Sequence, residues 1–231
     1  MGQDIRVVNY LHKDHYSTSE FWSQLIWALI ERGFGYTHPE WRGLYIDPET
    51  GDWVREEEPN GDSRTRLTNA VKKTSEVGIS GGISLYYDFD GAIHGGSIGL
   101  YSIKESDWMY VTYSTPASAI YREPSVYHGT LNIGRILYEI LEPRVGYIRQ
   151  TMEIHPPWPN ELDCRIETLH NISYLPKEVV EDLGREKIKS SQIHKYYKLP
   201  NGGLELHLCE KALHGCGSEK REAVERHLGI D

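Results

Sequence analysis

Alternating residues at positions 83–89, followed by a hairpin turn, constrain the fold more than any other feature of the chain. Apolar side chains stand at every second position there and polar or amphipathic ones stand between them, which is the period of a strand with one buried face. The pair Asp90-Gly91 is typical of a two-residue hairpin turn. Further strand patterns cover residues 97–103 and 108–113. The stretch therefore predicts an antiparallel meander.

Helical patterns surround this meander. Apolar residues recur at helical spacing over residues 19–32, 64–76 and 130–141, and a charged helix is expected over 218–228. A second hairpin is predicted where residues 193–199 and 204–208 meet across Pro200-Asn-Gly-Gly203.

Strands that come in hairpins between helices predict an α+β fold in which helices pack on antiparallel sheet. We expect one domain over residues 1–231. The alternative is a subdivision into residues 1–120 and 121–231, two similar halves that share one core.

Charge and composition exclude several classes of partner. The 231 residues include 25 Lys and Arg against 34 Asp and Glu, a net charge of −9, with no basic cluster. Nucleic acids and anionic membranes both need clustered cations, so neither is expected as a partner. No apolar run approaches the ~20 residues of a membrane span. Three cysteines are too few for a disulfide framework, which favours a reducing, cytoplasmic location.

A glycine-rich stretch offers one catalytic candidate. Gly78-Ile-Ser80-Gly-Gly82 matches G-x-S-x-G, in which the serine of an α/β-hydrolase sits on a turn from strand to helix. Here the order is reversed, because a helix pattern precedes the motif and a strand pattern follows it. We therefore favour a glycine-rich entry into a strand, with Ser80 as nucleophile the alternative.

Histidines and cysteines gather near the C-terminal end and offer a metal candidate. His207, Cys209, His214 and Cys216 could together hold zinc in a tetrahedral site. Their spacing is not one of the usual structural zinc patterns, so no cofactor is expected and zinc is the alternative. Cys164 stands apart and is expected to be buried as a small apolar side chain.

Aromatic and acidic residues suggest a binding surface. Tyrosine and tryptophan provide rigid contact area with a polar tip, which suits protein interfaces, although aromatic residues also simply favour strands. An acidic loop would attract a basic partner. The expected binding residues are Tyr86, Tyr101, Trp108, Tyr110, Glu56, Glu57 and Glu58.

A succession of short motifs carries a family resemblance. It consists of Leu137-x3-Leu141-x-Pro143-x2-Gly146-Tyr147, Ile172-Ser-Tyr174-Leu-Pro176, Val180-x2-Leu183-Gly184 and Asn201-Gly-Gly203-Leu-Glu-Leu206. Over the second half of the chain this resembles polymorphic-toxin immunity proteins of the immunity protein 52 type and related uncharacterised families. The resemblance implies an α+β protein that binds and neutralises a toxin, and it carries over no neutralising residue.

The leading hypothesis is therefore a non-enzymatic intracellular binding protein, immunity-like, with a basic protein partner. The alternative is a hydrolase or metal-dependent enzyme that uses Ser80 or the His207, Cys209, His214 and Cys216 set. A third hypothesis is an assembly subunit that works by self-association.

Overall fold

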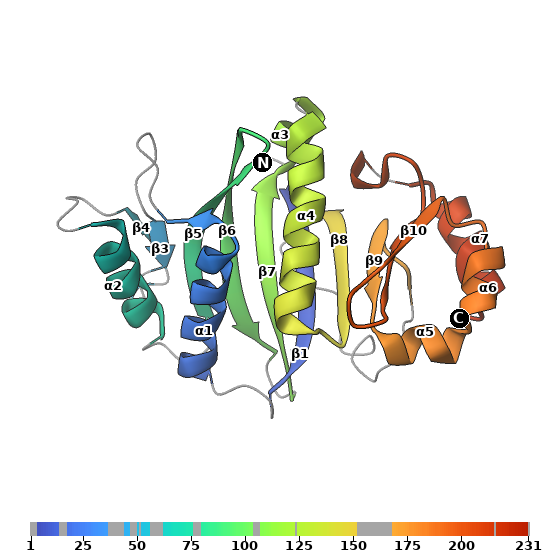
Figure 1. Cartoon of the computed structure of the whole chain (residues 1–231), viewed down its shortest axis with the longest axis horizontal. Coiled ribbons are helices and arrows are strands. Elements are labelled where there is room, and N and C mark those ends of the chain that lie inside the picture. Colours follow the sequence, from blue (N-terminus) through green and yellow to red (C-terminus); the bar gives the residue numbers. More distant parts are fainter. Residues whose placement is uncertain are drawn as a thin grey trace.

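The structure is a computed structural model that describes residues 4–13, 18–36, 44–46, 50, 52–55, 62–75, 80–103, 107–122, 124–151, 168–214 and 216–230. Eleven strands form one sheet (Figure 1). They are β1 (Asp4–His12), β2 (Phe34–Gly35), β3 (Leu44–Ile46), β4 (Trp53–Arg55), β5 (Ser80–Phe89), β6 (Ala92–Ser102), β7 (Trp108–Pro116), β8 (Val145–Thr151), β9 (Ile172–Leu175), β10 (Lys195–Lys198) and β11 (Leu204–His207). The helices are α1 (Thr18–Glu31), α2 (Ser63–Ser75), α3 (Ala117–Arg122), α4 (Pro124–Leu141), α5 (Lys177–Leu183), α6 (Arg185–Ser190) and α7 (Ser218–Leu228), with a short 3-10 helix, η3 (Ala212–His214).

The strand order is β10-β11-β9-β8-β1-β7-β6-β5-β3-β4, with β2 added beside β5, and every pairing is antiparallel. The predicted α+β class is confirmed, as are the meander β5-β6-β7 and the hairpin β10-β11. At the first hairpin Asp90 and Gly91 take φ of 54° and 76°, the left-handed pair that a tight turn of this kind requires. The same sheet runs through both residues 1–120 and residues 121–231.

Strand β1 lies in the middle of the sheet, and no pattern in the sequence predicted it. Val7 pairs with Tyr113 of β7 on one side and with Ile148 of β8 on the other. Both faces of β1 are covered, since Ile5 and Val7 belong to the main core while Val8 and Tyr10 belong to a separate cluster with Tyr147. A strand buried on two faces lacks the alternation by which strands are recognised.

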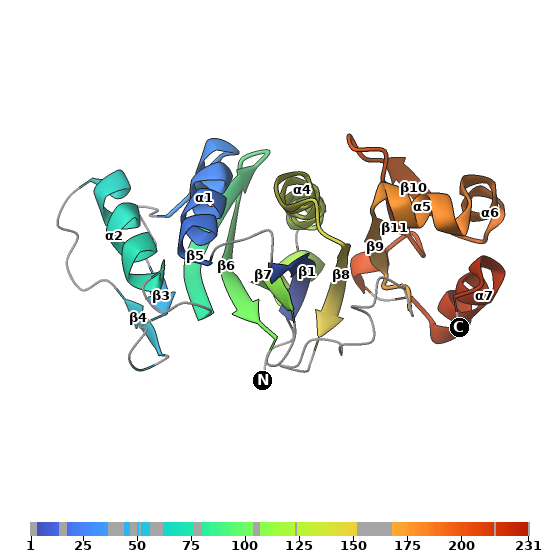
Figure 2. The same cartoon turned by 90° about the horizontal axis from the view of Figure 1, so that it is seen from below.

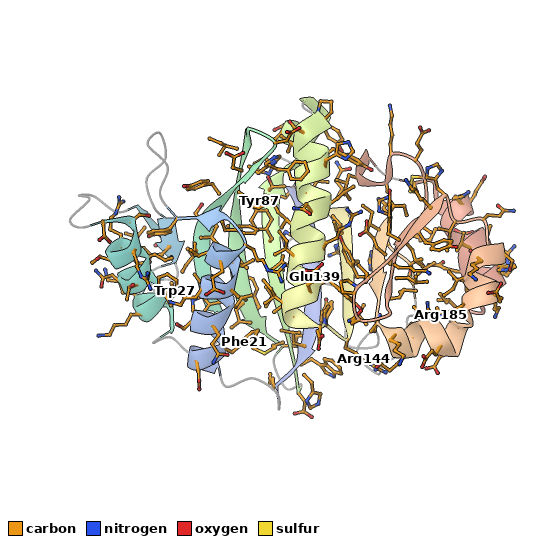
Figure 3. The ribbon with its side chains drawn as sticks, viewed as in Figure 1. Phe21, Trp27, Tyr87, Glu139, Arg144 and Arg185 are labelled. Carbon is orange, nitrogen blue, oxygen red and sulfur yellow. A yellow bond between two sulfur atoms is a disulfide. The ribbon has the colours of Figure 1, made fainter. Side chains whose placement is uncertain are left out.

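Helices α1, α2 and α4 lie over one face of the sheet (Figure 2). Their apolar stripes, which include Leu25 and Leu29 of α1 and Ile133 and Leu137 of α4, form the main core against that face. Figure 3 shows Trp27 on the side of α1 towards α2, where the guanidinium of Arg64 lies 5.4 Å from its ring centroid. A second core joins β9 and β11 to α5, α6 and α7 through Leu206, Val180, Ile188 and Val224, among others.

Helix α4 is the element that positions the candidate site. Val126, Thr130, Ile133, Leu137 and Leu141 are all buried, three or four residues apart, as one helix face requires. The helix begins at Pro124, six residues before the predicted start at 130, because Val126 extends that face and proline suits a first helical position.

Helix α4 packs tightly on the sheet at Gly134, where a Cβ atom would lie 2.1 Å from Oη of Tyr174. Only glycine allows that approach. Strand β9 lies between β8 and β11, and all four of its residues are buried.

Candidate functional site

A pocket of about 500 Å³ lies between helix α4 and the β10-β11 hairpin. Helix α4 contributes Tyr127, Asn132 and Arg135 to its walls, and the hairpin contributes Lys195, Tyr197 and His207. The register of the β10-β11 hairpin explains why its residues line the pocket, because Lys195 pairs with His207 and Tyr197 pairs with Glu205. Side chains of directly paired residues and of every second residue share one face of a sheet, so all four point to the face that α4 covers.

A charged cluster forms the floor of this pocket. Arg135 donates two hydrogen bonds to the carboxylate of Glu205, from Nε to Oε2 at 2.5 Å and from Nη2 to Oε1 at 2.9 Å. Nε2 of His207 lies 2.6 Å from Oε1 of the same carboxylate. The Glu205 side chain is fully buried, whereas that of Arg135 is 34% exposed, so the arginine connects the buried carboxylate with the pocket.

The contacts of Glu205 keep it ionised. Burial raises the pKa of its carboxyl, but the hydrogen bonds from His207 and Arg135 outweigh burial and leave the pKa below its ordinary value. The hydroxyl of Tyr174, opposite Glu205 in the neighbouring strand, has a pKa well above its ordinary value because it is fully buried near this carboxylate. The ionised carboxylate of Glu205 and the guanidinium of Arg135 therefore form a fixed ion pair at the floor of the pocket.

Two cations lie near the ring of Tyr197 in the pocket wall. Cζ of Arg135 is 4.8 Å and Nζ of Lys195 is 4.7 Å from its centroid, distances at which cation–π attraction acts. Arg135 uses two of its five N–H groups on Glu205, so its guanidinium retains donors. The exposed side chains of Lys195, His128 and His194 add further donors at the rim.

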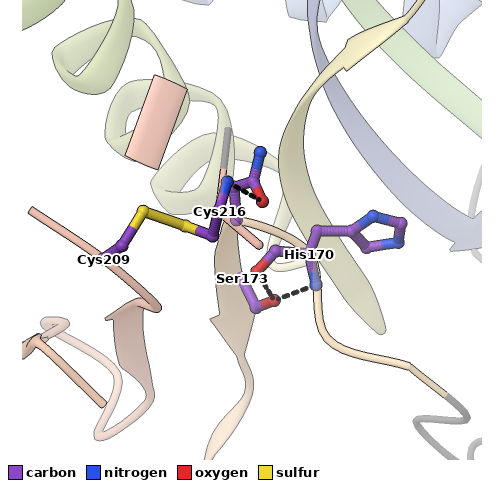
Figure 4. Close-up of a disulfide and its surroundings, with 5 residues drawn as sticks. His170, Ser173, Cys209 and Cys216 are labelled. Carbon is purple, nitrogen blue, oxygen red and sulfur yellow. Dashed lines mark hydrogen bonds between the residues drawn. A yellow bond between two sulfur atoms is a disulfide. The ribbon is translucent and has the colours of Figure 1, made fainter. Parts of the chain in front are cut away.

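A disulfide closes the loop beside the pocket. Cys209 and Cys216 are bonded to each other (Figure 4), and Glu210 within this loop lines the pocket. The backbone N–H of Cys216 donates to Oδ1 of Asn171 at 3.3 Å, and that of Leu208 donates to the Asn171 carbonyl at 3.0 Å. The loop is thus tied to the start of β9 at both of its ends.

The predicted zinc set is not assembled in this state. The sulfur atoms of Cys209 and Cys216 are bonded to each other and so offer no thiolate, His207 is held by Glu205, and the side chain of His214 lies outside the described residues. Across the described ranges, no group of three or more His, Cys, Asp or Glu side chains is placed to hold a metal ion. The disulfide also removes the sequence argument for a reducing compartment, which assumed free thiols.

Ser80 is the first residue of β5, and its backbone pairs with Tyr101 of β6. Helix α2 precedes it and a strand follows it, the reverse of the strand-to-helix turn of a nucleophile elbow. Its side chain lies outside the described residues, as does the whole of Cys164.

The predicted binding residues that the structure describes do not line the pocket. Tyr101 and Tyr110 stack with ring centroids 5.1 Å apart, and Tyr110 continues to Tyr10 at 5.8 Å. Burial raises the pKa of both Tyr101 and Tyr110. These tyrosines, with Trp108, belong to the face of the sheet opposite α4.

Tyr86, a further predicted binding residue, lies elsewhere in the sheet. A Cβ atom at Gly35 would lie 2.1 Å from the ring of Tyr86, so Tyr86 packs over β2. Glu56, Glu57 and Glu58 lie outside the described residues. Of the pocket residues, only His207 was singled out in the sequence, and then as a metal ligand.

Comparison of the chain with models of known protein families, with curated proteins and with solved structures finds no match. None of the helices in the described ranges is both long and apolar enough to cross a membrane.

Proposed function

We propose that the chain is a non-enzymatic binding protein that engages a protein partner through the pocket between α4 and the β10-β11 hairpin. The observation that carries this proposal is the set of cations and aromatic rings at that pocket. The guanidinium of Arg135 and the ammonium of Lys195 each lie within 5 Å of the Tyr197 ring centroid, and all three residues line the pocket. Tyrosine and arginine, together with tryptophan, are the residues most enriched among those that dominate binding energies.

The buried ion pair supports the same proposal. Glu205 fixes the guanidinium of Arg135 with two hydrogen bonds, so the remaining donors are held in place before a partner arrives. A preorganised side chain loses less conformational entropy on binding. In the immunity-like form of the proposal, which rests on the sequence resemblance, the partner is a toxin. The net charge of −9 favours a partner that is basic overall.

The test is direct binding to the products of neighbouring genes. Each is purified and titrated calorimetrically with the wild type, with Tyr197→Ala and with Lys72→Glu, a matched surface change on α2 far from the pocket. We expect one neighbour to bind, Tyr197→Ala to weaken it by about tenfold or more, and Lys72→Glu to leave it unchanged. Absence of binding to every neighbour would overturn the toxin form. Equal affinities of Tyr197→Ala and the wild type would remove the pocket from the interface.

A second candidate function rests on the 2.6 Å contact between His207 and Glu205. A histidine oriented by a carboxylate is the arrangement that general bases use, so a hydrolase that uses His207 is the alternative. The sequence suggested two other versions of an enzyme, one with Ser80 as nucleophile and one with a zinc ion. Ester and phosphoester substrates test it. Turnover that is lost in His207→Gln would support an enzyme that uses His207, and turnover that persists in that variant would exclude His207 as its general base. Elemental analysis of the purified protein tests for zinc, and labelling by a fluorophosphonate tests Ser80 as the nucleophile.

A further inference from the structure

Strand β10 forms one edge of the sheet, and this edge is open within the described part of the chain. Its only neighbour in the sheet is β11, and the described residues place no strand on its outer side. Figures 1 and 2 show it at the end of the sheet next to α5 and α6. Lys195, Tyr196 and Lys198 are exposed, with Tyr196 38% exposed.

The hydrogen-bond pattern of the hairpin identifies the backbone groups on this open edge. The N–H of Leu199 donates to the carbonyl of Gly203 at 3.0 Å, so Leu199 and Gly203 are a hydrogen-bonded pair. In an antiparallel ladder such pairs alternate with non-bonded ones. The N–H and C=O groups of Lys195 and Tyr197 therefore face β11, and those of Tyr196 and Lys198 face outwards, away from the sheet.

The charges at this edge select what can pair with it. Lysines flank both ends of the four-residue strand, and edge lysines are a common protection against pairing between identical strands. Two copies of β10 side by side would bring four lysines together on one pair of strands, where like charges repel. An incoming strand with acidic residues opposite Lys195 and Lys198 would meet the opposite charge at both ends.

We infer that β10 binds an extended acidic segment of the partner by strand addition, with two acidic residues three positions apart. The inference rests on the proposed function, because it names the segment that the partner would supply. Residues opposite Lys195 and Tyr197 would share their face of the sheet, and so would border the pocket. A partner that is basic overall can still carry such a segment, because the segment needs only two acidic residues.

Synthetic peptides test the inference without the partner. One eight-residue peptide carries two glutamates three positions apart in a Thr/Val background, and its matched control carries lysines instead. By NMR titration of the full chain, we expect the glutamate peptide to bind about tenfold or more tightly and to slow hydrogen exchange at the amides of Tyr196 and Lys198. The double variant Lys195→Glu/Lys198→Glu should reverse the preference. Equal affinity of the two peptides, or protection elsewhere only, would overturn the inference.

A backbone variant separates strand addition from simple charge attraction. Tyr196→Pro removes an N–H that points outwards and leaves the β10-β11 ladder its donors, whereas Tyr196→Phe keeps the N–H. We expect the proline variant to lose the glutamate peptide and the phenylalanine variant to keep it. If the proline variant does not fold, a glutamate peptide N-methylated at alternate positions replaces it, and it should fail to bind.

The neighbouring-gene partner then distinguishes the two proposals. A partner that binds the wild type and Tyr196→Pro equally well would overturn strand addition while the binding function stands. Peptide binding at β10 in a chain to which no neighbour binds would support the edge site and count against the proposed function.

Discussion

Arg135 of α4 and Glu205 of β11 are joined by two hydrogen bonds, at 2.5 and 2.9 Å, across 70 residues of sequence. Removal of the arginine would leave a buried carboxylate with His207 as its remaining partner. We expect Arg135→Met to lower the free energy of unfolding by about 3 kcal/mol, measured by urea denaturation at pH 7. The double variant Arg135→Met/Glu205→Leu should recover much of the loss.

The matched control is Arg32→Met, which breaks the pair of Arg32 with Glu139 at 2.9 Å between partly exposed side chains. Pairs of that kind contribute less than about 1 kcal/mol. Equal losses in Arg135→Met and Arg32→Met would contradict the buried ion pair.

His170 should make the fold acid-sensitive. It stacks on Tyr147 with ring centroids 3.7 Å apart, and burial, with Arg149 and Arg221 nearby, lowers its pKa from 6.5 to about 3. The unfolded chain takes up this proton at a higher pH than the folded chain does. Its contribution to stability is therefore present above pH 6.5 and is lost as the pH falls towards 3. Urea midpoints should fall more steeply between pH 7 and 5 in the wild type than in His170→Asn, and parallel curves would refute this.

Gly134 should not tolerate a side chain. A Cβ atom there would lie 2.1 Å from Oη of Tyr174 and 3.0 Å from Cδ1 of Ile148. We expect Gly134→Ala to destabilise the protein by about 3 kcal/mol in denaturant titrations, and Tyr174→Phe to restore part of that loss. Gly217→Ala is the control, because a Cβ atom there meets nothing within 4 Å.

Tyr174→Phe alone is expected to be neutral or stabilising. The buried hydroxyl has no hydrogen-bond partner among the described residues, so its removal leaves no group unsatisfied. A clear loss of stability in this single variant would mean that the hydroxyl has a partner after all.

The disulfide predicts a thiol count and a stability change. Of the three cysteines, Cys209 and Cys216 are paired, so the unfolded, unreduced chain should show one reactive thiol and the reduced chain three. Closing a loop of this size contributes about 2 kcal/mol. Reductant should therefore lower the melting temperature of the wild type and leave Cys209→Ser/Cys216→Ser unaffected. Three reactive thiols before reduction would show that the bond does not form.

The spacing of apolar residues predicted many of the helices and strands, because an element with one buried face repeats its apolar side chains at a fixed period. The helix predicted over 218–228 has the observed bounds of α7, whereas the strands predicted over 83–89, 97–103 and 108–113 overlap β5, β6 and β7 but miss three to five residues at one end of each. Strand β1 was not predicted because apolar residues stand on both of its faces. In addition, a buried polar residue, Asn9, lies on the face that packs against the main core. A strand whose two faces are both buried shows no alternation of apolar and polar residues, so this pattern cannot identify it.

The site was harder to predict because it joins distant segments. Its charged floor depends on α4 crossing β11, which the sequence does not show. The one local signal was Glu205-x-His207 in a predicted strand, a spacing that places both side chains on one face. Predicted aromatic residues were chosen by type, and Tyr101 and Tyr110 proved to stack with each other in the sheet.

The central place of β1 has a consequence for how the chain is made. The last residue of β1, His12, pairs with Trp108, and Asp4 pairs with Thr151. Once made, β1 therefore has no neighbour in the sheet until β7 follows, which begins 96 positions after His12. Until then its two apolar faces and both of its edges stay uncovered, which is when a nascent chain is most prone to aggregate. Such long-range pairing also makes folding slow. A chain truncated before β8 would keep β1 as an open edge.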